Sequence, residues 1–206
     1  MPQLEFWYEF ASTYTYLSVM RIEDLAAKRG VGVVWRPFLL GPIFLAQGWR
    51  DTPFRLYPRK GLYMVRDMER LCAARGLPFK LSRRFPQNGL NAARLAYLGV
   101  NEGWAPAFTR EVFLRQFRDE ADISDNAVLA EALQTIGQDP VELLARIQDP
   151  AVKQALKSQT DMAAALGIFG APTFLTEDNE MFWGDDRLEQ AVDWAAGQKA
   201  PDAVSA

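Results

Sequence analysis

The sequence contains no histidine and only one cysteine, Cys72, among its 206 residues. Without histidine, the commonest general base and the commonest zinc ligand are both missing, which excludes Ser-His-Asp and Cys-His catalysis. A single cysteine can form neither an intrachain disulfide nor a Cys-x-x-Cys redox pair. We therefore expect no metal site and no oxidoreductase that works through its own dithiol, and we expect Cys72 to be a buried small hydrophobic residue.

The sequence also lacks a strong charge of one sign and any long hydrophobic run. Its net charge is −3 and its pI is about 5.2, so no basic field indicates a nucleic acid as partner. No segment reaches the ~18 to 20 apolar residues that span a bilayer. The first residues lack the basic and apolar regions of a signal peptide. These absences lead us to expect a cytoplasmic protein with no nucleic-acid and no membrane partner.

The start of the chain has the pattern of a βαβ unit. Residues 3–10 are rich in aromatic side chains and predict a buried strand. Ser12 or Thr13 can cap the helix that follows, and its apolar positions recur at helical spacing as far as Gly30, where a helix commonly ends. Residues 31–36 predict a second strand.

The middle of the chain shows no strand pattern. Gly41-Pro42 and then residues 48–58, with three charged residues and two prolines, predict a loop with little regular structure. The helices predicted after it span residues 61–75, 89–101, 105–117, 126–136, 140–147 and 150–166. We interpret this span as a helical insertion.

Strand patterns return near the end of the chain. Residues 173–176 and 181–183 predict a hairpin, and Asp185 or Asp186 can cap a last helix that ends near residue 196. Pro172 directly precedes the first of these strands, which predicts a fixed turn in which a cis peptide bond is one form.

Five segments, in this order, resemble the DsbA-related superfamily, and within it the 2-hydroxychromene-2-carboxylate isomerases and the kappa-class glutathione transferases. The segments are residues 9–17 (EFASTYTYL), 36–41 (RPFLLG), 60–64 (KGLYM), 170–174 (GAPTF) and 182–187 (FWGDDR). The resemblance implies an α/β, thioredoxin-like fold with a large all-helical insertion, as in DsbA. Residues 1–40 and 168–197 would form the thioredoxin-like domain, residues 41–167 the helical insertion, and residues 198–206 a tail.

Ser12 is the candidate catalytic residue. In DsbA-type oxidoreductases the first helix begins with Cys-x-x-Cys, and the same places here read Ser12, Thr13, Tyr14 and Thr15. The N-terminus of a helix stabilises an anion such as a thiolate. Because the protein has no thiol at this place, the site is suited to a thiol that a ligand supplies. Ser12 is then either a plain N-cap or the donor to a bound thiolate. The resemblance favours the donor and implies glutathione as the cofactor.

The resemblance also implies the residues that bind glutathione. Ala171, before Pro172, would pair its backbone with the cysteinyl unit, and Thr13 and Tyr14 would face the cofactor at the helix start. Asp185 and Asp186 would contact the γ-glutamyl end, although either could instead be an N-cap. Asp186 matches the aspartate of the family, whereas Asp185 replaces a smaller polar residue.

Three further residues are candidates for substrate binding. Lys60 precedes a predicted helix, where a cation is slightly unfavourable, and could hold a carboxylate or simply lie on the surface. Trp49 and Arg50 occupy the place where relatives contact glutathione through an asparagine, which neither preserves. Asn88 could cap a helix or reach the cleft.

The resemblance implies a glutathione-dependent cis–trans isomerase acting on an aromatic keto acid. The reaction would interconvert 2-hydroxychromene-2-carboxylate and trans-o-hydroxybenzylidenepyruvate in aromatic hydrocarbon catabolism, in a homodimeric enzyme. Two alternatives stay open. One is a kappa-class-like glutathione transferase or peroxidase, and the other is a non-catalytic protein that keeps the thioredoxin-fold binding groove.

Overall fold

The computed structural model of the protein describes residues 1–49 and 51–198. In chain order its elements are β1 (Gln3–Tyr8), α1 (Thr13–Val19), α2 (Ile22–Lys28), β2 (Gly32–Pro37), α3 (Leu40–Ala46), α4 (Pro53–Leu56), α5 (Pro58–Ala74), α6 (Leu90–Glu102), α7 (Ala105–Phe117), α8 (Asn126–Thr135), α9 (Pro140–Arg146), α10 (Pro150–Ala165), β3 (Thr173–Thr176), β4 (Met181–Trp183), the 3₁₀ turn η1 (Asp185–Arg187) and α11 (Leu188–Ala195). No helix in this described part is both long and apolar enough to cross a membrane.

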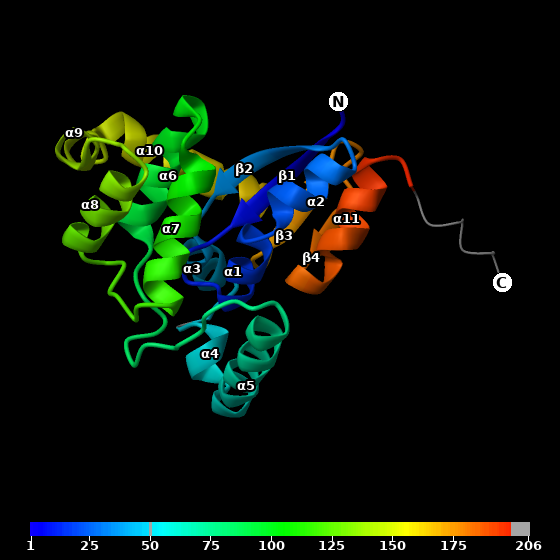
Figure 1. Cartoon of the computed structure of the whole chain (residues 1–206), viewed down its shortest axis with the longest axis horizontal. Coiled ribbons are helices and arrows are strands. Elements are labelled where there is room, and N and C mark those ends of the chain that lie inside the picture. The colour runs from blue at the N-terminus through cyan, green and yellow to red at the C-terminus, as the bar shows by residue number, and fades with distance from the viewer. Residues whose placement is uncertain (50, 199–206) are drawn as a thin grey trace.

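A four-stranded mixed sheet lies at the centre of the fold, in the order β2-β1-β3-β4 (Figure 1). Strand β1 pairs in parallel with β2 and antiparallel with β3, and β3 pairs antiparallel with β4. The parallel pair is joined through α1 and α2, which confirms the predicted βαβ unit. All the helices from α3 to α10 follow β2 and precede β3, so the large helical segment within an α/β fold is confirmed as well.

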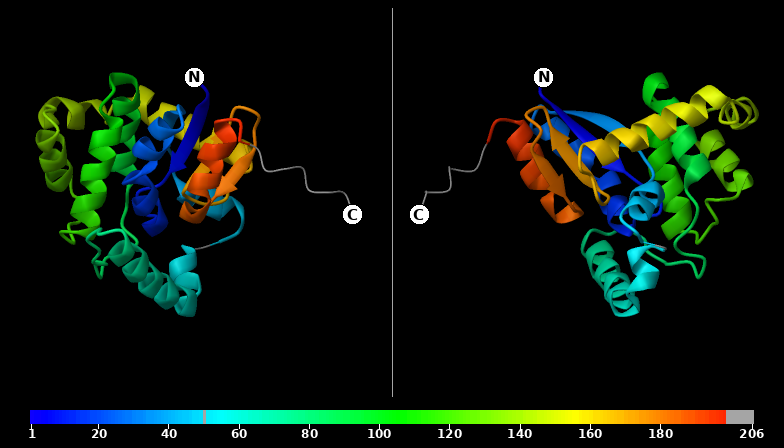
Figure 2. Two further views of the ribbon diagram at one scale, coloured as in Figure 1. Left: turned by 45° about the vertical axis from the view of Figure 1, so that its right-hand side comes forward. Right: turned by 180° about the vertical axis from the view of Figure 1, so that it is seen from behind.

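Alternate side chains of β1 face two different cores, one on each side of the sheet. Phe6 and Tyr8 belong to the larger core, together with side chains of α1, α2 and α11. Trp7 belongs to the smaller core, which contains Ile43 of α3 and Ala163 of α10. Figure 2 shows α11 and α10 on opposite sides of the sheet. Burial of both faces explains the three consecutive aromatic residues Phe6, Trp7 and Tyr8 at the end of this strand.

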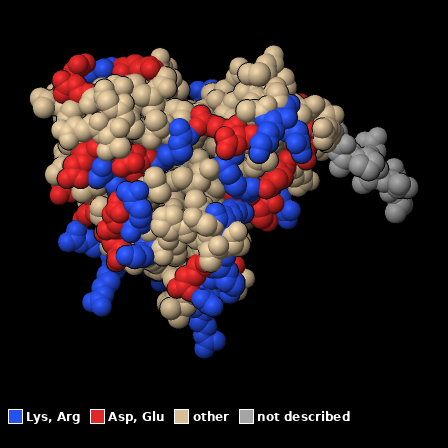
Figure 3. Space-filling model, in the orientation of Figure 1, with Lys and Arg blue, Asp and Glu red and all other residues tan. Residues whose placement is uncertain are grey.

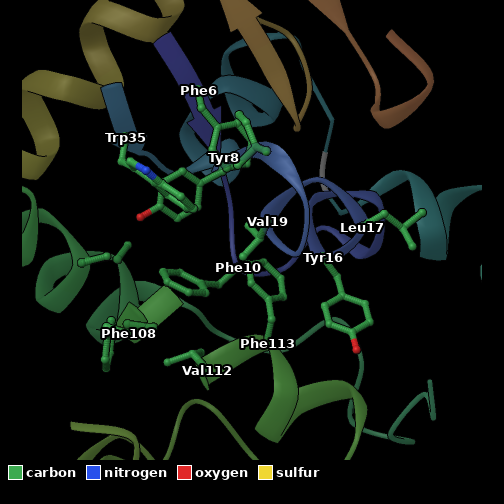
Figure 4. Packing of buried hydrophobic residues seen from close by; sticks show 14 of the residues in the cluster. Phe6, Tyr8, Phe10, Tyr16, Leu17, Val19, Trp35, Phe108, Val112 and Phe113 are labelled. Atoms are coloured by element: carbon green, nitrogen blue, oxygen red, sulfur yellow. The ribbon is translucent and has the colours of Figure 1, made fainter. Parts of the chain in front are cut away.

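The helical segment shares the larger core with the sheet and with the first helix. Phe10, just after β1, stacks on Phe113 of α7 with ring centroids 5.3 Å apart. Tyr16 of α1 lies near the same ring, at 6.1 Å (Figure 4). This packing fixes the loop between β1 and α1 against α7. The division into residues 1–40 and 168–197 on one side and 41–167 on the other stays a prediction, and residues 199–206 of the predicted tail lie outside the described residues.

The structure corrects two predictions. The first helix does not run unbroken to Gly30, because it ends at Met20 and a second helix, α2, begins after Arg21. The segments predicted as loop contain the start of α3 and the whole of α4, both of which are short helices. Prolines lie in the first turn of each, at Pro42 and Pro53, where the missing N–H has no intrahelical partner and proline is tolerated.

Charges of both signs are interspersed on the face of the molecule shown in Figure 3. This distribution agrees with the small net charge of the sequence. Among the residues that the structure describes, no group of three or more cysteine, aspartate or glutamate side chains could hold a metal ion.

Candidate functional site

Ser12 is the N-cap of α1. Its backbone is extended, with φ −98° and ψ 120°, and its hydroxyl oxygen accepts a hydrogen bond of 3.4 Å from the N–H of Thr15. The N–H of Ser12 donates to the carbonyl of Glu9 at 3.1 Å, which closes the turn between β1 and α1. The predicted capping role is therefore confirmed, and the question is what else this hydroxyl can do.

The turn before β3 lies directly against Ser12. The peptide bond between Ala171 and Pro172 is cis, which is one form of the fixed turn that the sequence predicts here. The hydroxyl of Ser12 donates to the carbonyl oxygen of Ala171 at 2.8 Å. Within the described part of the chain, the N–H of Ala171 donates to no other protein group. The two ends of the fold therefore meet at a hydroxyl and a peptide group that can both take part in hydrogen bonds with a ligand.

A cavity of about 760 Å³ opens beside this contact. Its volume lies within the range of small-molecule sites, about 300 to 1,000 Å³. The residues predicted for the site that line this cavity are Ser12, Thr13, Tyr14, Trp49, Lys60, Asn88 and Ala171. Residues from the loop before α1, from α3 to α5, from the loop before α6 and from the turn before β3 thus surround one space.

Aromatic rings form much of the cavity wall. They occur as contacting pairs, with ring centroids 4.9 to 5.1 Å apart. The pairs are Phe44 with Trp49, Phe54 with Phe85, and Phe169 with Trp183. Flat rings of this kind suit a flat, largely apolar ligand, because they offer large contact areas and few polar groups.

The charged side chains of the cavity lie mostly at its rim. Arg55 approaches Asp51 at 3.7 Å, so each has a partner of opposite charge. The ammonium group of Lys60 lies 5.1 Å from the ring centroid of Tyr57. Among the described residues, no carboxylate lies within ion-pair distance of Lys60, whose charge is therefore free to bind an anion that enters the cavity.

Glu9 is a buried carboxylate of the cavity that the sequence analysis did not select. Its side chain is 5% exposed, and it accepts hydrogen bonds from the N–H groups of Leu40 at 2.8 Å and of Ala11 at 3.3 Å. Burial raises the pKa of Glu9 to about 7, against these hydrogen bonds, which lower it. A charged residue that interrupts an apolar run three positions before Ser12 was the signal that could have identified it.

The family model that describes the DsbA-like thioredoxin domain matches residues 3–194 of the chain. The chain belongs to this family. Its sequence is 27% identical to a 2-hydroxychromene-2-carboxylate isomerase of Sphingobium xenophagum, over 90% of this chain and 94% of that protein. It is also 27% identical to human glutathione S-transferase kappa 1, over 90% of this chain and 87% of that one.

Solved structures confirm the DsbA-like fold. A 2-hydroxychromene-2-carboxylate isomerase superposes with a TM-score of 0.85 over 95% of both chains, at 24% identity. A cytosolic disulfide reductase, DsbM, of Pseudomonas aeruginosa, solved with glutathione, gives a TM-score of 0.63 over 95% of this chain and 96% of that one, at 16% identity. The sequence relatives are isomerases and glutathione transferases, which supports an enzyme of this DsbA-like family.

In this DsbA-like chain the active-site cysteines of the oxidoreductases are absent from the cavity. Cys72 is buried in α5 and does not line it, as the sequence predicts. Burial raises the pKa of the Cys72 thiol to about 11, so it is a poor nucleophile near neutral pH.

Asp185 and Asp186 do not line the cavity. Asp185 is 3% exposed and outside the cavity lining, and its carboxylate accepts hydrogen bonds from Ser18 at 2.9 Å and Arg75 at 2.7 Å. Arg21 completes this group at 3.1 Å. Neither aspartate makes a side-chain cap, so the predicted N-caps are wrong. Ion pairs with Arg21, just before α2, and Arg75, just after α5, together with the hydrogen bond from Ser18 of α1, hold the carboxylate of Asp185 in place.

The remaining predicted residues have these positions. Asp186 is 75% exposed in its side chain and does not line the cavity. Pro172 is buried behind Ala171, and the side chain of Asn88 accepts from the N–H of Leu90 at 3.0 Å while it also lines the cavity. Arg50 lies outside the described residues. The roles of all these residues toward a ligand stay predictions.

Proposed function

We propose that the protein is a glutathione-dependent cis–trans isomerase of an aromatic keto acid, of the 2-hydroxychromene-2-carboxylate isomerase type. The observation that carries the proposal is the contact between Ser12 and Ala171 at the edge of an aromatic cavity into which the protein places no thiol of its own. A thiol that reacts at this site would have to come from a ligand.

The residues beside Ser12 fit the cysteinyl unit of glutathione. A hydroxyl group has one proton, which Ser12 now donates to the carbonyl of Ala171. Turning that proton toward a thiolate stabilises the sulfur anion by a charge-assisted hydrogen bond. This rotation of the hydroxyl also frees a lone pair of the Ala171 carbonyl oxygen. The C=O and the N–H of Ala171 can then both pair with the backbone of the ligand, as they would with an added strand.

Glutathione, when bound, supplies a thiolate that can add to a conjugated double bond and leave again, which permits rotation about that bond. The protein would hold the double bond of the substrate in position for attack by the thiolate. The rings of Trp49 and Phe54 offer flat surfaces to an aromatic substrate, and Lys60 offers a positive charge to its carboxylate. None of these contributions needs a histidine, which agrees with a sequence that has none.

A glutathione transferase of the kappa class is a second candidate. The human kappa-class relative is as similar to this chain, at 27% identity, as the isomerase relative is. The two activities use the same thiolate site and differ in whether the adduct is released. We further propose that the enzyme acts in the cytoplasm as a homodimer in aromatic catabolism.

The test is product analysis with 2-hydroxychromene-2-carboxylate, with and without glutathione. The isomerase predicts a product of unchanged mass and trans geometry, whose rate of formation depends on glutathione that is not consumed. A product whose mass has increased by glutathione would identify the transferase. Equal rates with and without glutathione would contradict both candidates.

A further inference from the structure

Glu9 differs from every other titratable side chain of the cavity in its burial. The others within the described lining are Tyr14, Asp51, Arg55, Tyr57 and Lys60, and each of them is partly or fully exposed. Glu9 is thus shielded from bulk water and at the same time belongs to the cavity lining. This position is suited to proton exchange with a ligand in the cavity.

Among the described residues, no cation forms an ion pair with Glu9. Among these residues, its carboxylate accepts hydrogen bonds only from backbone N–H groups, those of Leu40, Ala11 and Phe10, whereas Glu5 of β1 has the guanidinium of Arg36 at 2.6 Å. A buried carboxylate without a counter-charge is costly, and the group responds by holding its proton up to higher pH. A carboxyl that titrates near pH 7 can both accept and return a proton under physiological conditions.

Glu9 forms hydrogen bonds within the turn between β1 and α1, the turn that contains Ser12. The carbonyl of Glu9 accepts from the N–H of Ser12 at 3.1 Å, and its side-chain oxygen Oε1 accepts from the N–H of Ala11 at 3.3 Å. The second distance is long, which leaves Oε1 with lone pairs for another donor. A Cβ atom at Gly89 would lie 3.2 Å from Oε1, so the glycine leaves room for the carboxyl at this place.

Within the described part of the chain, the elements packed around Glu9 place no charged side chain in contact with its carboxyl group. Helix α3 contains no titratable residue. The segment before α6 contributes the neutral side chains of Gln87 and Asn88, and α1 contributes Tyr14. Of the described charges of the cavity, those of Asp51, Arg55 and Lys60, none forms a hydrogen bond or an ion pair with Glu9.

We propose that Glu9 is the proton-exchange group of the cavity, which takes the proton that a thiol loses when it binds beside Ser12 as a thiolate. The S–H bond breaks, its electron pair stays on sulfur, and the proton passes to an oxygen of the Glu9 carboxylate. The transfer reverses when the thiol leaves, so no other reactant is needed. This inference rests on the proposed use of glutathione.

The experiment observes the carboxyl of Glu9 directly, by ¹³C NMR of protein labelled at the glutamate side-chain carboxyl. Glu9→Gln identifies the resonance, and Glu9→Asp does so if the first variant fails to fold. Glutathione and S-methylglutathione, which has no thiol proton to give, are each added at pH 8. Glu5→Gln, on the strand that leads to Glu9, is the matched control and removes a resonance that glutathione does not move.

The expected result is that glutathione shifts the Glu9 resonance from its ionised to its protonated position, by about the full titration range, whereas S-methylglutathione leaves it ionised. Glutathione that binds, as seen from shifts elsewhere in the spectrum, while Glu9 stays ionised would overturn the inference and leave the proposed function standing. An absence of any shift at saturating glutathione would overturn both.

Discussion

The hydroxyl of Ser12 donates a hydrogen bond of 2.8 Å to the carbonyl of Ala171, which lies 159 residues further along the chain. The same oxygen accepts the capping bond from Thr15. One side chain thus begins the first helix and connects it to the turn before β3. A ligand thiolate would compete with Ala171 for the single hydroxyl proton, so binding and the internal bond exclude each other at this atom.

Ser12→Ala is predicted to lower both stability and activity. The loss of the cap and of the bond to Ala171 costs about 1 to 2 kcal/mol in the free energy of unfolding, measured by urea denaturation. The loss of the donor lowers kcat by about 100-fold or more. Asp125→Ala is the control, because it removes the N-cap of α8 away from the cavity. Equal activity of the two variants would contradict a role of Ser12 in the reaction.

Asp185→Asn is predicted to destabilise the fold without weakening glutathione binding. Its buried carboxylate compensates Arg21 and Arg75, and its loss costs about 2 to 3 kcal/mol, allowing for the partial exposure of both arginines. Asp186→Asn, at the exposed neighbouring position, is expected to leave stability unchanged. Denaturation and calorimetry on both variants check this. A selective loss of glutathione affinity in either variant would restore that aspartate as a ligand of the γ-glutamyl end.

Glu9→Gln is predicted to change how stability depends on pH. Because burial raises the pKa of Glu9 from 4.5 to about 7, the folded state holds a proton that the unfolded state has lost between these values. The stabilisation is complete below pH 4.5 and disappears as the pH rises through 7, by up to about 3 kcal/mol. Thermal unfolding between pH 4 and 8 should show this fall in the native protein relative to the variant. Parallel curves would contradict the raised pKa.

Lys60→Gln is predicted to weaken the binding of a carboxylate substrate. Removing the unpaired charge raises KM about 10-fold, equal to about 1.4 kcal/mol, with little effect on kcat. Arg59→Gln removes a neighbouring charge that does not line the cavity and is expected to leave KM unchanged. An equal rise in KM for both variants would indicate a general effect of charge rather than a specific contact.

The strands and most helices could be predicted because local patterns decide them. The strand at residues 173–176 is bounded by Pro172 and by a polar turn, and the helix at residues 105–117 follows its apolar spacing. Helices α3 and α4 were missed because the prolines in their first turns have the composition of a loop. The break at Arg21 was missed because the apolar spacing continues across it; Arg21 itself pairs with Asp185, far along the chain.

The candidate site also contains some residues that the sequence could predict and others that it could not. Ser12 and Ala171 lie on segments with recognisable motifs, and the structure brings them into contact. The position of Glu9 in the sequence, three residues before Ser12 in an apolar run, could have drawn attention to it, but its burial against Leu40 and Gly89 depends on the tertiary fold. The pairing of the Asp185 carboxylate with Arg21 and Arg75 is likewise a tertiary feature, because both arginines lie far from it along the chain.

The most direct test of the central claim is isothermal titration calorimetry of glutathione and of S-methylglutathione, on the native protein and on Ser12→Ala. Buffers of different ionisation enthalpy report the protons that leave the complex. We predict that the native protein binds glutathione more tightly than its S-methyl derivative, by about 10-fold or more, and that Ser12→Ala abolishes this preference. Equal binding of the two ligands by the native protein, or no binding at millimolar concentration, would contradict a site that stabilises a thiolate.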